Sequence, residues 1–196
     1  RCMDAAGMNK ASITNSWGST SDIESEFRIS ARTAIYRKSA SAPLAWLLSQ
    51  GLLKGSVINY GKGRYDVDSN AIRQDVGHCV DYDYTFSPMN ISGKSFQTVF
   101  AGYVVNTLPP LARRVAWTEL ANLTAKDGAA FVAARSDSAN GEPYEDGVRT
   151  SRLTFQRRYL KGELATEASL YFPIVEEIKT GSGYRIVRCR HCPDEM

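Results

Sequence analysis

Two hydrophobic periods alternate along this chain, and together they predict its fold class. Short apolar runs predict buried strands at residues 56–60, 96–102 and 129–134, with a further strand ending at residues 80–83. Apolar positions spaced by three and four predict helices at about residues 43–51, 67–76 and 110–123. Because strands and helices alternate, we expect an α/β fold with a mostly parallel central sheet and helices on both faces.

The two ends of the chain depart from this alternation. Residues 1–20 mix Gly, Ser, Asn and Thr without a period, and they predict a loose lead-in before a single domain at residues 21–196. Residues 160–170 predict a helix, and residues 169–175 and 184–189 predict an antiparallel strand pair. The polar stretch at residues 136–150 predicts a loop that is too long for a simple connector.

The composition adds limits rather than a function. At 196 residues, with 43% apolar and 23% charged residues, the chain has the size and composition of one globular domain with a real core. No apolar run approaches the roughly 18 residues of a membrane-spanning helix. The first residues also lack a basic-then-apolar leader, so we expect a cytoplasmic protein without a membrane partner. The net charge of +3 does not by itself call for nucleic acid.

A glycine pair after the first predicted strand marks a candidate ligand site. Gly61 and Gly63 stand between the strand at residues 56–60 and the helix at residues 67–76. Such a unit brings backbone N–H groups and a helix N-terminus to one point, where nucleotide-like ligands bind. The dinucleotide fingerprint needs a third glycine where this chain has Asp66, so the pattern disfavours NAD.

An acid at the tip of the second predicted strand is the second landmark. In Rossmann-like units, an acid about 20 residues beyond the glycines accepts hydrogen bonds from ribose hydroxyls. Asp81 and Asp83 both fit, since the period of a strand puts them on the same side. We favour Asp83 because it is nearer the tip. The alternative is that Asp83 is only a solvated acid of a turn.

With these landmarks in place, a family resemblance becomes specific. The pieces that carry it are Arg32-Thr33-Ala34, Arg37-Lys38, Ser41-Ala42-Pro43, Tyr60-Gly61-Lys62-Gly63-Arg64, Asp66-Val67, Tyr82-Asp83-Tyr84, Pro88, Tyr103-Val104-Val105-Asn106 and Thr154-Phe155-Gln156. Residues 32–160, about two-thirds of the chain, resemble the class I methyltransferases associated with DNA phosphorothioation clusters and their phage-encoded relatives. The resemblance implies a Rossmann-like class I methyltransferase fold with an antiparallel C-terminal strand. It also implies S-adenosylmethionine (SAM) as the cofactor.

The resemblance implies roles for individual residues as well. It puts the glycine loop under the methionine part of SAM and Asp83 on the ribose, and it makes residues 136–150 a candidate substrate lid. The expected cofactor-binding residues are Asn59, Tyr60, Gly61, Lys62, Gly63, Asp83, Tyr84, Ala101 and Gly102. The candidates for catalysis are Asn106, Tyr103 and Arg37, and no convincing general base stands out.

Two positions depart from the usual motif of that class. Asn59 stands where an acid is usual, and Tyr65 stands where a third glycine is usual. Asn59 can form hydrogen bonds but cannot neutralise the ammonium group of SAM, and Tyr65 narrows the loop. Two alternatives to a methyltransferase therefore stay open. One is a non-catalytic inhibitor or sensor that binds SAM or a nucleotide, and the other is a lyase or hydrolase that consumes SAM.

A basic run bears on the methyl acceptor. Five cations follow the long polar stretch and could neutralise several phosphates, namely Arg149, Arg152, Arg157, Arg158 and Lys161. Together with the genomic setting of the resembled family, this run favours nucleic acid as the acceptor. The alternative is that the cations pair with nearby acids, such as Glu142 and Asp146, and form a solvated surface.

The cysteines carry a weak metal pattern. Cys189 and Cys192 have Cys-x-x-Cys spacing with His191 between them, which could begin a zinc site. A complete site needs four ligands, and only Cys2 remains as a distant partner, so we expect no metal. Cys79 fits a small buried apolar position, and no disulfide framework is expected.

Overall fold

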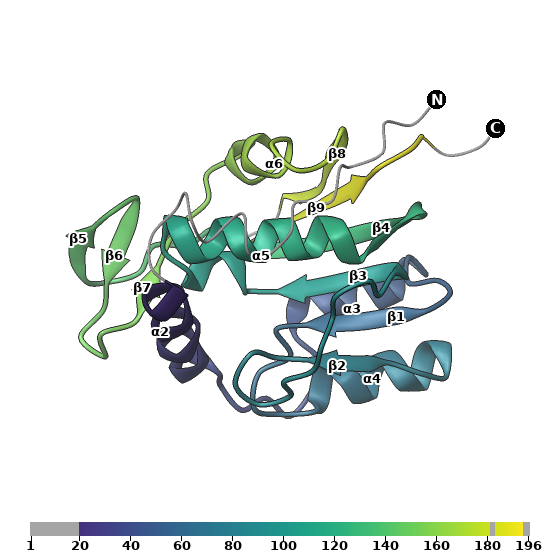
Figure 1. The fold of residues 1–196 in the computed structure, drawn as a ribbon, viewed down its shortest axis with the longest axis horizontal. Helices are drawn as coiled ribbons and strands as arrows, with labels where there is room; N and C mark the ends of the chain where they lie inside the picture. Colours follow the sequence, from purple (N-terminus) through teal and green to yellow (C-terminus); the bar gives the residue numbers. More distant parts are fainter. Residues whose placement is uncertain (1–19, 181–182, 194–196) are drawn as a thin grey trace.

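The protein folds around one twisted sheet. A computed structural model describes residues 20–180 and 183–193, so residues 1–19 of the predicted lead-in, Cys2 included, lie outside the described residues. Within these ranges, six strands form the sheet in the order β2-β1-β3-β4-β9-β8 (Figure 1). They are β1 (Val57–Tyr60), β2 (Val80–Tyr82), β3 (Phe96–Gly102), β4 (Thr124–Arg135), β8 (Ile174–Thr180) and β9 (Tyr184–Arg190).

The strand directions match the predicted topology. β1 pairs in parallel with β2 and with β3, so that Ile58 lies opposite Val80 on one side and Val99 on the other. β3 pairs in parallel with β4. β9 is antiparallel to both β4 and β8. The mostly parallel sheet with an antiparallel last strand is therefore confirmed.

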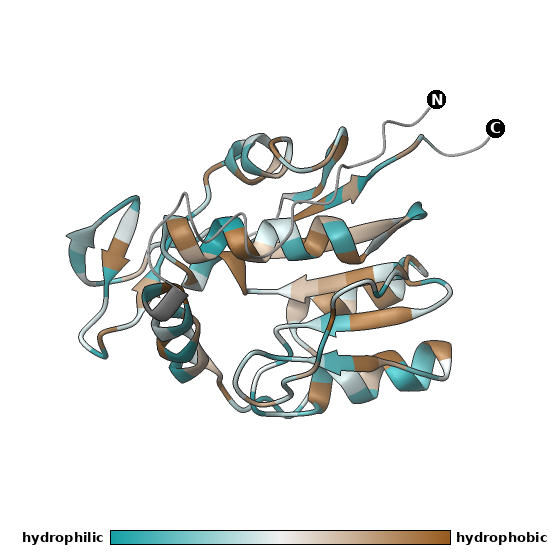
Figure 2. Cartoon of the chain, in the orientation of Figure 1, coloured by the Kyte–Doolittle hydropathy of each residue, from teal (hydrophilic) through white to brown (hydrophobic). Residues whose placement is uncertain are grey.

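Helices cover both faces of the sheet. Successive side chains of a strand point to opposite faces, so a continuous apolar strand has an apolar surface on each face for a helix to cover. One face packs against α2 (Thr20–Ser30), α5 (Pro110–Leu123) and α6 (Glu163–Ala168). The other face packs against α3 (Ala42–Ser49) and α4 (Val67–Val76). Tyr60 and Trp117 belong to the first core, and Leu44, Ile72 and Phe100 belong to the second. Hydrophobic residues accordingly follow β1 and one side of α5 (Figure 2).

The predicted loop at residues 136–150 is in part a second, smaller sheet. β5 (Glu142–Tyr144) and β6 (Gly147–Arg149) form a hairpin, and β7 (Phe155–Gln156) pairs with β6. This three-stranded sheet lies beside the end of α2 in Figure 1. The polar composition concealed it because two of its strands are only three residues long and lie at the surface, where no apolar run is needed.

Three predicted boundaries are wrong. β4 begins at Thr124, five residues before the strand predicted at residues 129–134. Gly128 lets the strand continue close beside β3 because it has no Cβ. A Cβ at this position would lie 2.7 Å from the Gln97 carbonyl oxygen. α6 is shorter than residues 160–170, and β8 begins at Ile174, five residues later than expected. In the described ranges no helix is both long and apolar enough to cross a membrane.

Candidate functional site

A pocket opens where the path of the sheet reverses. After β1 the chain forms β2 on one side of it and then crosses to form β3 on the other side. The segments that leave β1 and β3 therefore diverge at the carboxyl ends of these strands. Open α/β sheets bind ligands in the crevice at this point. The pocket is lined from four segments, within residues 27–37, 59–68, 82–84 and 100–107. Of the nine predicted cofactor-binding residues, eight lie in this lining, and the ninth, Ala101, packs in the core instead.

The glycine loop has a shape that other residues resist. Gly61 and Gly63 have φ of +70° and +73°, in the left-handed region that favours glycine. A Cβ at Gly61 would also lie 2.4 Å from Cγ2 of Val104, which follows β3. The N–H groups of Gly61 and Lys62 both donate to the Tyr82 carbonyl, at 2.7 and 3.1 Å. These bonds join the loop to the end of β2.

Asp83 holds the glycine loop from the other side. It is 8% exposed, and its Oδ2 accepts the N–H of Gly63 at 2.9 Å. Its Oδ1 accepts the N–H groups of Thr85 and Phe86, each at 2.9 Å. A carboxylate offers about four acceptor positions, so the three bonds from described residues leave one, on Oδ2. Asp83 is therefore buried rather than solvated, but it also caps the turn after β2 as the alternative interpretation allowed, and it lies in the lining of the pocket.

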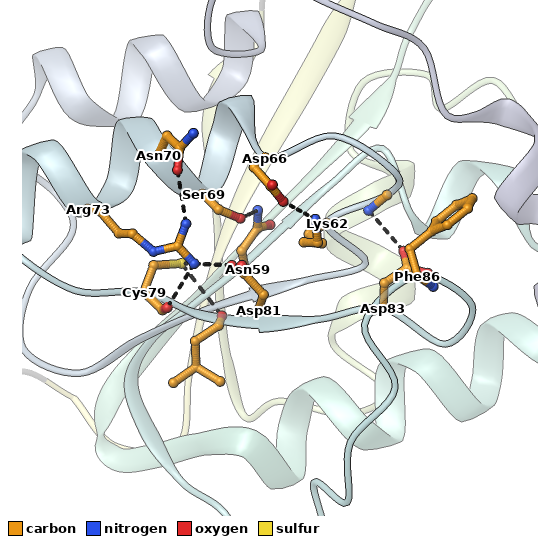
Figure 3. A network of polar contacts seen from close by, with 12 residues as sticks. Asn59, Lys62, Asp66, Ser69, Asn70, Arg73, Cys79, Asp81, Asp83 and Phe86 are labelled. Carbon is orange, nitrogen blue, oxygen red and sulfur yellow. Dashed lines mark hydrogen bonds and ion pairs between the residues drawn. The ribbon is translucent and has the colours of Figure 1, made fainter.

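Asp81 faces a different environment from Asp83. Its carboxylate accepts from Arg73 at 2.6 Å and is 20% exposed. Arg73 projects from α4, so this ion pair ties the helix to β2, away from the glycine loop (Figure 3). Asp81 is absent from the pocket lining and Asp83 is part of it. The pocket geometry thus separates two acids that the sequence pattern left equivalent.

Asn59 lies at the floor of the pocket with one side-chain bond. It is 2% exposed, and its Nδ2 donates to Oγ of Ser69 on α4 at 3.0 Å (Figure 3). Lys62 of the loop forms an ion pair with Asp66, which precedes α4. Tyr65 also lines the pocket, where its ring meets Tyr36 edge-on, with the centroids 5.4 Å apart. The two residues that depart from the usual motif are thus both in the site.

Residues 30–41, here called the covering segment, pass over the glycine loop. At one end, Ser30 at the end of α2 shares a 2.6 Å hydrogen bond with Thr107. At the other end, Ser41 donates through its backbone N–H and its hydroxyl to the two carboxylate oxygens of Asp68, both at 2.7 Å. The sequence prediction missed Ser30, Thr107 and Asp68 as pocket residues. Its one available signal was the Arg32-Thr33-Ala34 piece of the resemblance, which lies in this segment.

The three candidate catalytic residues separate in space. Arg37 and Tyr103 line the pocket, and the Arg37 guanidinium lies over the Tyr103 ring, 5.6 Å from its centroid. Tyr103 has φ of +61°, a strained backbone conformation that often occurs at functional sites. Burial raises the pKa of Tyr103, so its phenol is a poor base at neutral pH. Asn106 is not part of the lining, and its Nδ2 donates to Gln156 of β7 at 3.1 Å.

The basic run that favoured nucleic acid is engaged within the protein at Arg149 and Arg157. Arg157 forms ion pairs with Asp146 and Glu167, and its guanidinium lies over the Tyr159 ring. Arg149 pairs with Glu26 of α2 at 3.7 Å. Arg152, Arg158 and Lys161 are exposed. The run is therefore not one cationic face, because two of its five members serve contacts between segments of the chain.

The cysteine pattern does not form a metal centre in the described part of the chain. No group of three or more metal-ligating side chains gathers in the ranges 20–180 and 183–193. Burial raises the pKa of the Cys189 thiol, which is free, whereas Cys192 is disulfide-bonded. His191 stacks on Phe172 and contacts the Ala121 carbonyl at 2.8 Å. Burial raises the pKa of the Cys79 thiol to about 12, which matches an inert, partly buried position.

Comparison with known proteins extends the fold assignment. No family model and no curated protein matches the chain. A similar solved structure is 1,6-didemethyltoxoflavin-N1-methyltransferase of Burkholderia thailandensis with bound 1,6-didemethyltoxoflavin and S-adenosylhomocysteine. It is 15% identical with a TM-score of 0.60, over 87% of this chain and 85% of that one. The complex of DhpI with SAH is 15% identical with a TM-score of 0.53, over 87% and 93%.

A third similar structure is the N-terminal domain of EvdMO1 with SAH bound. It is 10% identical with a TM-score of 0.52, over 87% of this chain and 96% of that one. At such identities the likeness concerns the fold alone. The predicted Rossmann-like class I methyltransferase fold is confirmed.

Proposed function

We propose that the pocket binds SAM and that the protein transfers its methyl group to an acceptor. The observation that carries the proposal is the pairing of the glycine loop with Asp83 at the point where the sheet reverses. The loop is fixed by the Tyr82 carbonyl, and Asp83 keeps an acceptor position on Oδ2 beside it. That position suits a ribose hydroxyl. The shared fold with structures that hold S-adenosylhomocysteine supports the same ligand.

The residues at the other end of the pocket suit the amino-acid part of SAM. Asn59 provides a polar floor, and Gly61 and Gly102 also lie in the lining of the pocket. SAM supplies an electrophilic methyl group on a sulfonium, so alignment with a nucleophile accounts for much of the rate. Among the described residues, the lining holds two carboxylates and no histidine, and both carboxylates accept hydrogen bonds: Asp83 from backbone N–H groups and Asp68 from Ser41. The chain therefore contributes mainly binding and positioning.

We propose a small molecule rather than nucleic acid as the acceptor. The covering segment contributes to the lining of the pocket, together with the glycine loop and residues at the ends of β2 and β3. Arg149 and Arg157 are engaged in ion pairs, so the basic run offers fewer free cations than the sequence suggested. The toxoflavin-precursor enzyme with a similar fold is a methyltransferase solved with a small heterocycle.

Product analysis with methyl-labelled SAM tests the proposal. The protein is incubated with SAM alone and with the small-molecule fraction of a cell extract, and the labelled products are separated. Methyl transfer predicts S-adenosylhomocysteine in step with a labelled small product, only when the extract is present. Breakdown of SAM without the extract would identify a lyase or hydrolase. Binding without any turnover would identify a sensor or inhibitor, and label on added DNA or RNA would overturn the acceptor class.

A further inference from the structure

The pocket lining contains a carboxylate, Asp68, that the predicted site did not include. Asp68 lies in the first turn of α4 and is half-buried. Its Oδ1 accepts the Ser41 N–H and its Oδ2 accepts the Ser41 hydroxyl, both at 2.7 Å. A carboxylate offers about four acceptor positions, so these two bonds leave one position on each oxygen. Both donors are neutral and therefore do not cancel the charge of Asp68.

The cations of the same lining are held by other groups. Lys62 forms an ion pair with Asp66, and the Arg37 guanidinium lies over the Tyr103 ring. Among the described residues no ion pair joins either cation to Asp68. Asp68 thus presents a negative charge and spare acceptor positions at the pocket.

Asp68 adjoins the floor of the pocket at Asn59. Nδ2 of Asn59 donates to Oγ of Ser69 at 3.0 Å, and Ser69 follows Asp68 on α4 (Figure 3). Asn59 is 2% exposed and carries no charge, and it stands where an acid is usual in the methyltransferases that this chain resembles. A neutral residue and a charged residue therefore border the same end of the pocket.

We propose that Asp68 supplies the negative charge that position 59 lacks, and that it binds the α-ammonium group of the amino-acid part of SAM. This inference rests on the proposed function. It puts the ammonium group beside the first turn of α4, between Asn59 and the covering segment, rather than at the tip of β1. The other carboxylate of the described lining, Asp83, accepts three backbone N–H groups at the end of β2, where the ribose would bind. Asp68 is therefore the acid that the ammonium group can reach.

Two matched ligands test the assignment by calorimetric titration. S-adenosylhomocysteine has the α-ammonium group without a sulfonium, and its deaminated analogue has the same adenosine, thioether and carboxylate. Asp68→Asn keeps the shape of the side chain and can still bond both groups of Ser41, since an amide accepts and donates. It should weaken binding of S-adenosylhomocysteine by about tenfold, as expected for loss of a charge-assisted hydrogen bond. Binding of the analogue should stay unchanged or tighten slightly, because a negative charge is removed beside a ligand end that bears only a carboxylate.

Asn59→Asp provides a rescue in the Asp68→Asn background. It returns an acid to the same end of the pocket, so it should recover most of the lost affinity for S-adenosylhomocysteine without improving that for the analogue. A role of Asp68 as an anchor for Ser41 alone predicts no recovery, because Asn59→Asp restores no contact with Ser41. Absence of recovery in a folded double variant would therefore contradict the proposal.

Two further variants are controls. Ser41→Ala removes the hydroxyl bond to Asp68 and leaves the charge, so it should affect both ligands to the same extent. Asp75→Asn removes an exposed acid further along α4 and should affect neither ligand. Thermal melting shows whether each variant is folded. Equal loss of both ligands in Asp68→Asn, or no loss of either, would overturn the assignment. A parent protein that bound neither ligand would overturn the proposed function and this inference with it.

Discussion

The pocket and the smaller sheet both gather arginines and acids, but the two regions use them in different ways. In the pocket, Asp83 is bonded to backbone N–H groups, and Arg37 rests on an aromatic ring. Beside the smaller sheet, Arg113 and Arg157 share Glu167 and Asp146. Glu167 also accepts from Trp117 at 2.6 Å and from Tyr159 at 3.0 Å.

This difference distinguishes a binding site from a structural lock. Charges that neutralise one another at low exposure hold segments together, and removing one leaves its partners buried and unpaired. Charges that are held by backbone amides or by a ring keep some capacity for a ligand. The network around Glu167 joins α5 to α6 and to the turn between β5 and β6, whereas no such network of ion pairs among the described residues engages Asp83 and Arg37 of the pocket lining. The predictions below test this division, from the largest effect to the smallest.

The largest effect should come from Glu167→Ala. The side chain is 14% exposed and bonds to two arginines, so its loss should lower the free energy of unfolding by about 3–5 kcal/mol. Denaturant titration measures the change. Glu163→Ala on the same helix, whose side chain only accepts the Leu160 N–H, should cost about 1 kcal/mol. Equal costs for the two variants would show that the network is not a structural lock.

Gly61→Ala should lower the free energy of unfolding by about 2–4 kcal/mol. The left-handed backbone costs a non-glycine residue about 1–2 kcal/mol. The added Cβ would also lie 2.4 Å from Val104, which forces a local shift. Gly63→Ala is the control, since its φ is similar but its Cβ would meet Ala34 at an ordinary 3.5 Å. Denaturant titration should show the smaller loss for Gly63→Ala, and the reverse order would contradict the packing described here.

Asp83→Ala should weaken SAM binding by about 10- to 100-fold, or roughly 1.5–3 kcal/mol, because a charged acceptor of the ribose hydroxyls is lost. Asp81→Ala should change the affinity little, since Asp81 pairs with Arg73 outside the pocket. Calorimetric titration of both variants measures the contrast. If Asp81→Ala had the larger effect, the ribose site would belong to Asp81.

A smaller effect should come from Asn59→Asp, which should tighten SAM binding by up to about tenfold. A carboxylate at this buried position would attract the ammonium group of SAM. Ser69 can donate its hydroxyl to the new acid, so the existing bond is replaced rather than lost. Tyr65→Gly should do less, because it only removes the edge contact with Tyr36. Weaker binding by Asn59→Asp would mean that the amino-acid end lies elsewhere.

The sequence predicts the sheet well, because its central strands are continuous apolar runs and because glycines mark the ends of several predicted strands and helices. Gly61 after β1 and Gly77 after α4 are examples, and both adopt the positive φ that their positions require. The smaller sheet was not predictable in this way, since Glu142–Tyr144 and Gly147–Arg149 are exposed or half-buried strands without an apolar period. Their order depends on distant contacts such as the Arg113–Asp146 pair.

The candidate site was predictable where it follows the chain and not where distant segments meet. The glycine loop and Asp83 follow predicted strands, so spacing was enough to find them. The bonds of Ser30 to Thr107 and of Ser41 to Asp68 join residues 77 and 27 positions apart. No local pattern reports such contacts. For Arg157, the pairing with Asp146 is the alternative that the sequence left open, and the structure adds a second pairing with Glu167.

A crystal structure of the protein with S-adenosylhomocysteine tests the central claim most directly. The account predicts one ligand at the carboxyl ends of β1 and β3, with its ribose hydroxyls within hydrogen-bond distance of the Asp83 carboxylate. Its methionine-derived part should lie along the glycine loop, between Asn59 and the covering segment. A ligand bound elsewhere, or a pocket that stays empty at saturating ligand, would contradict the account.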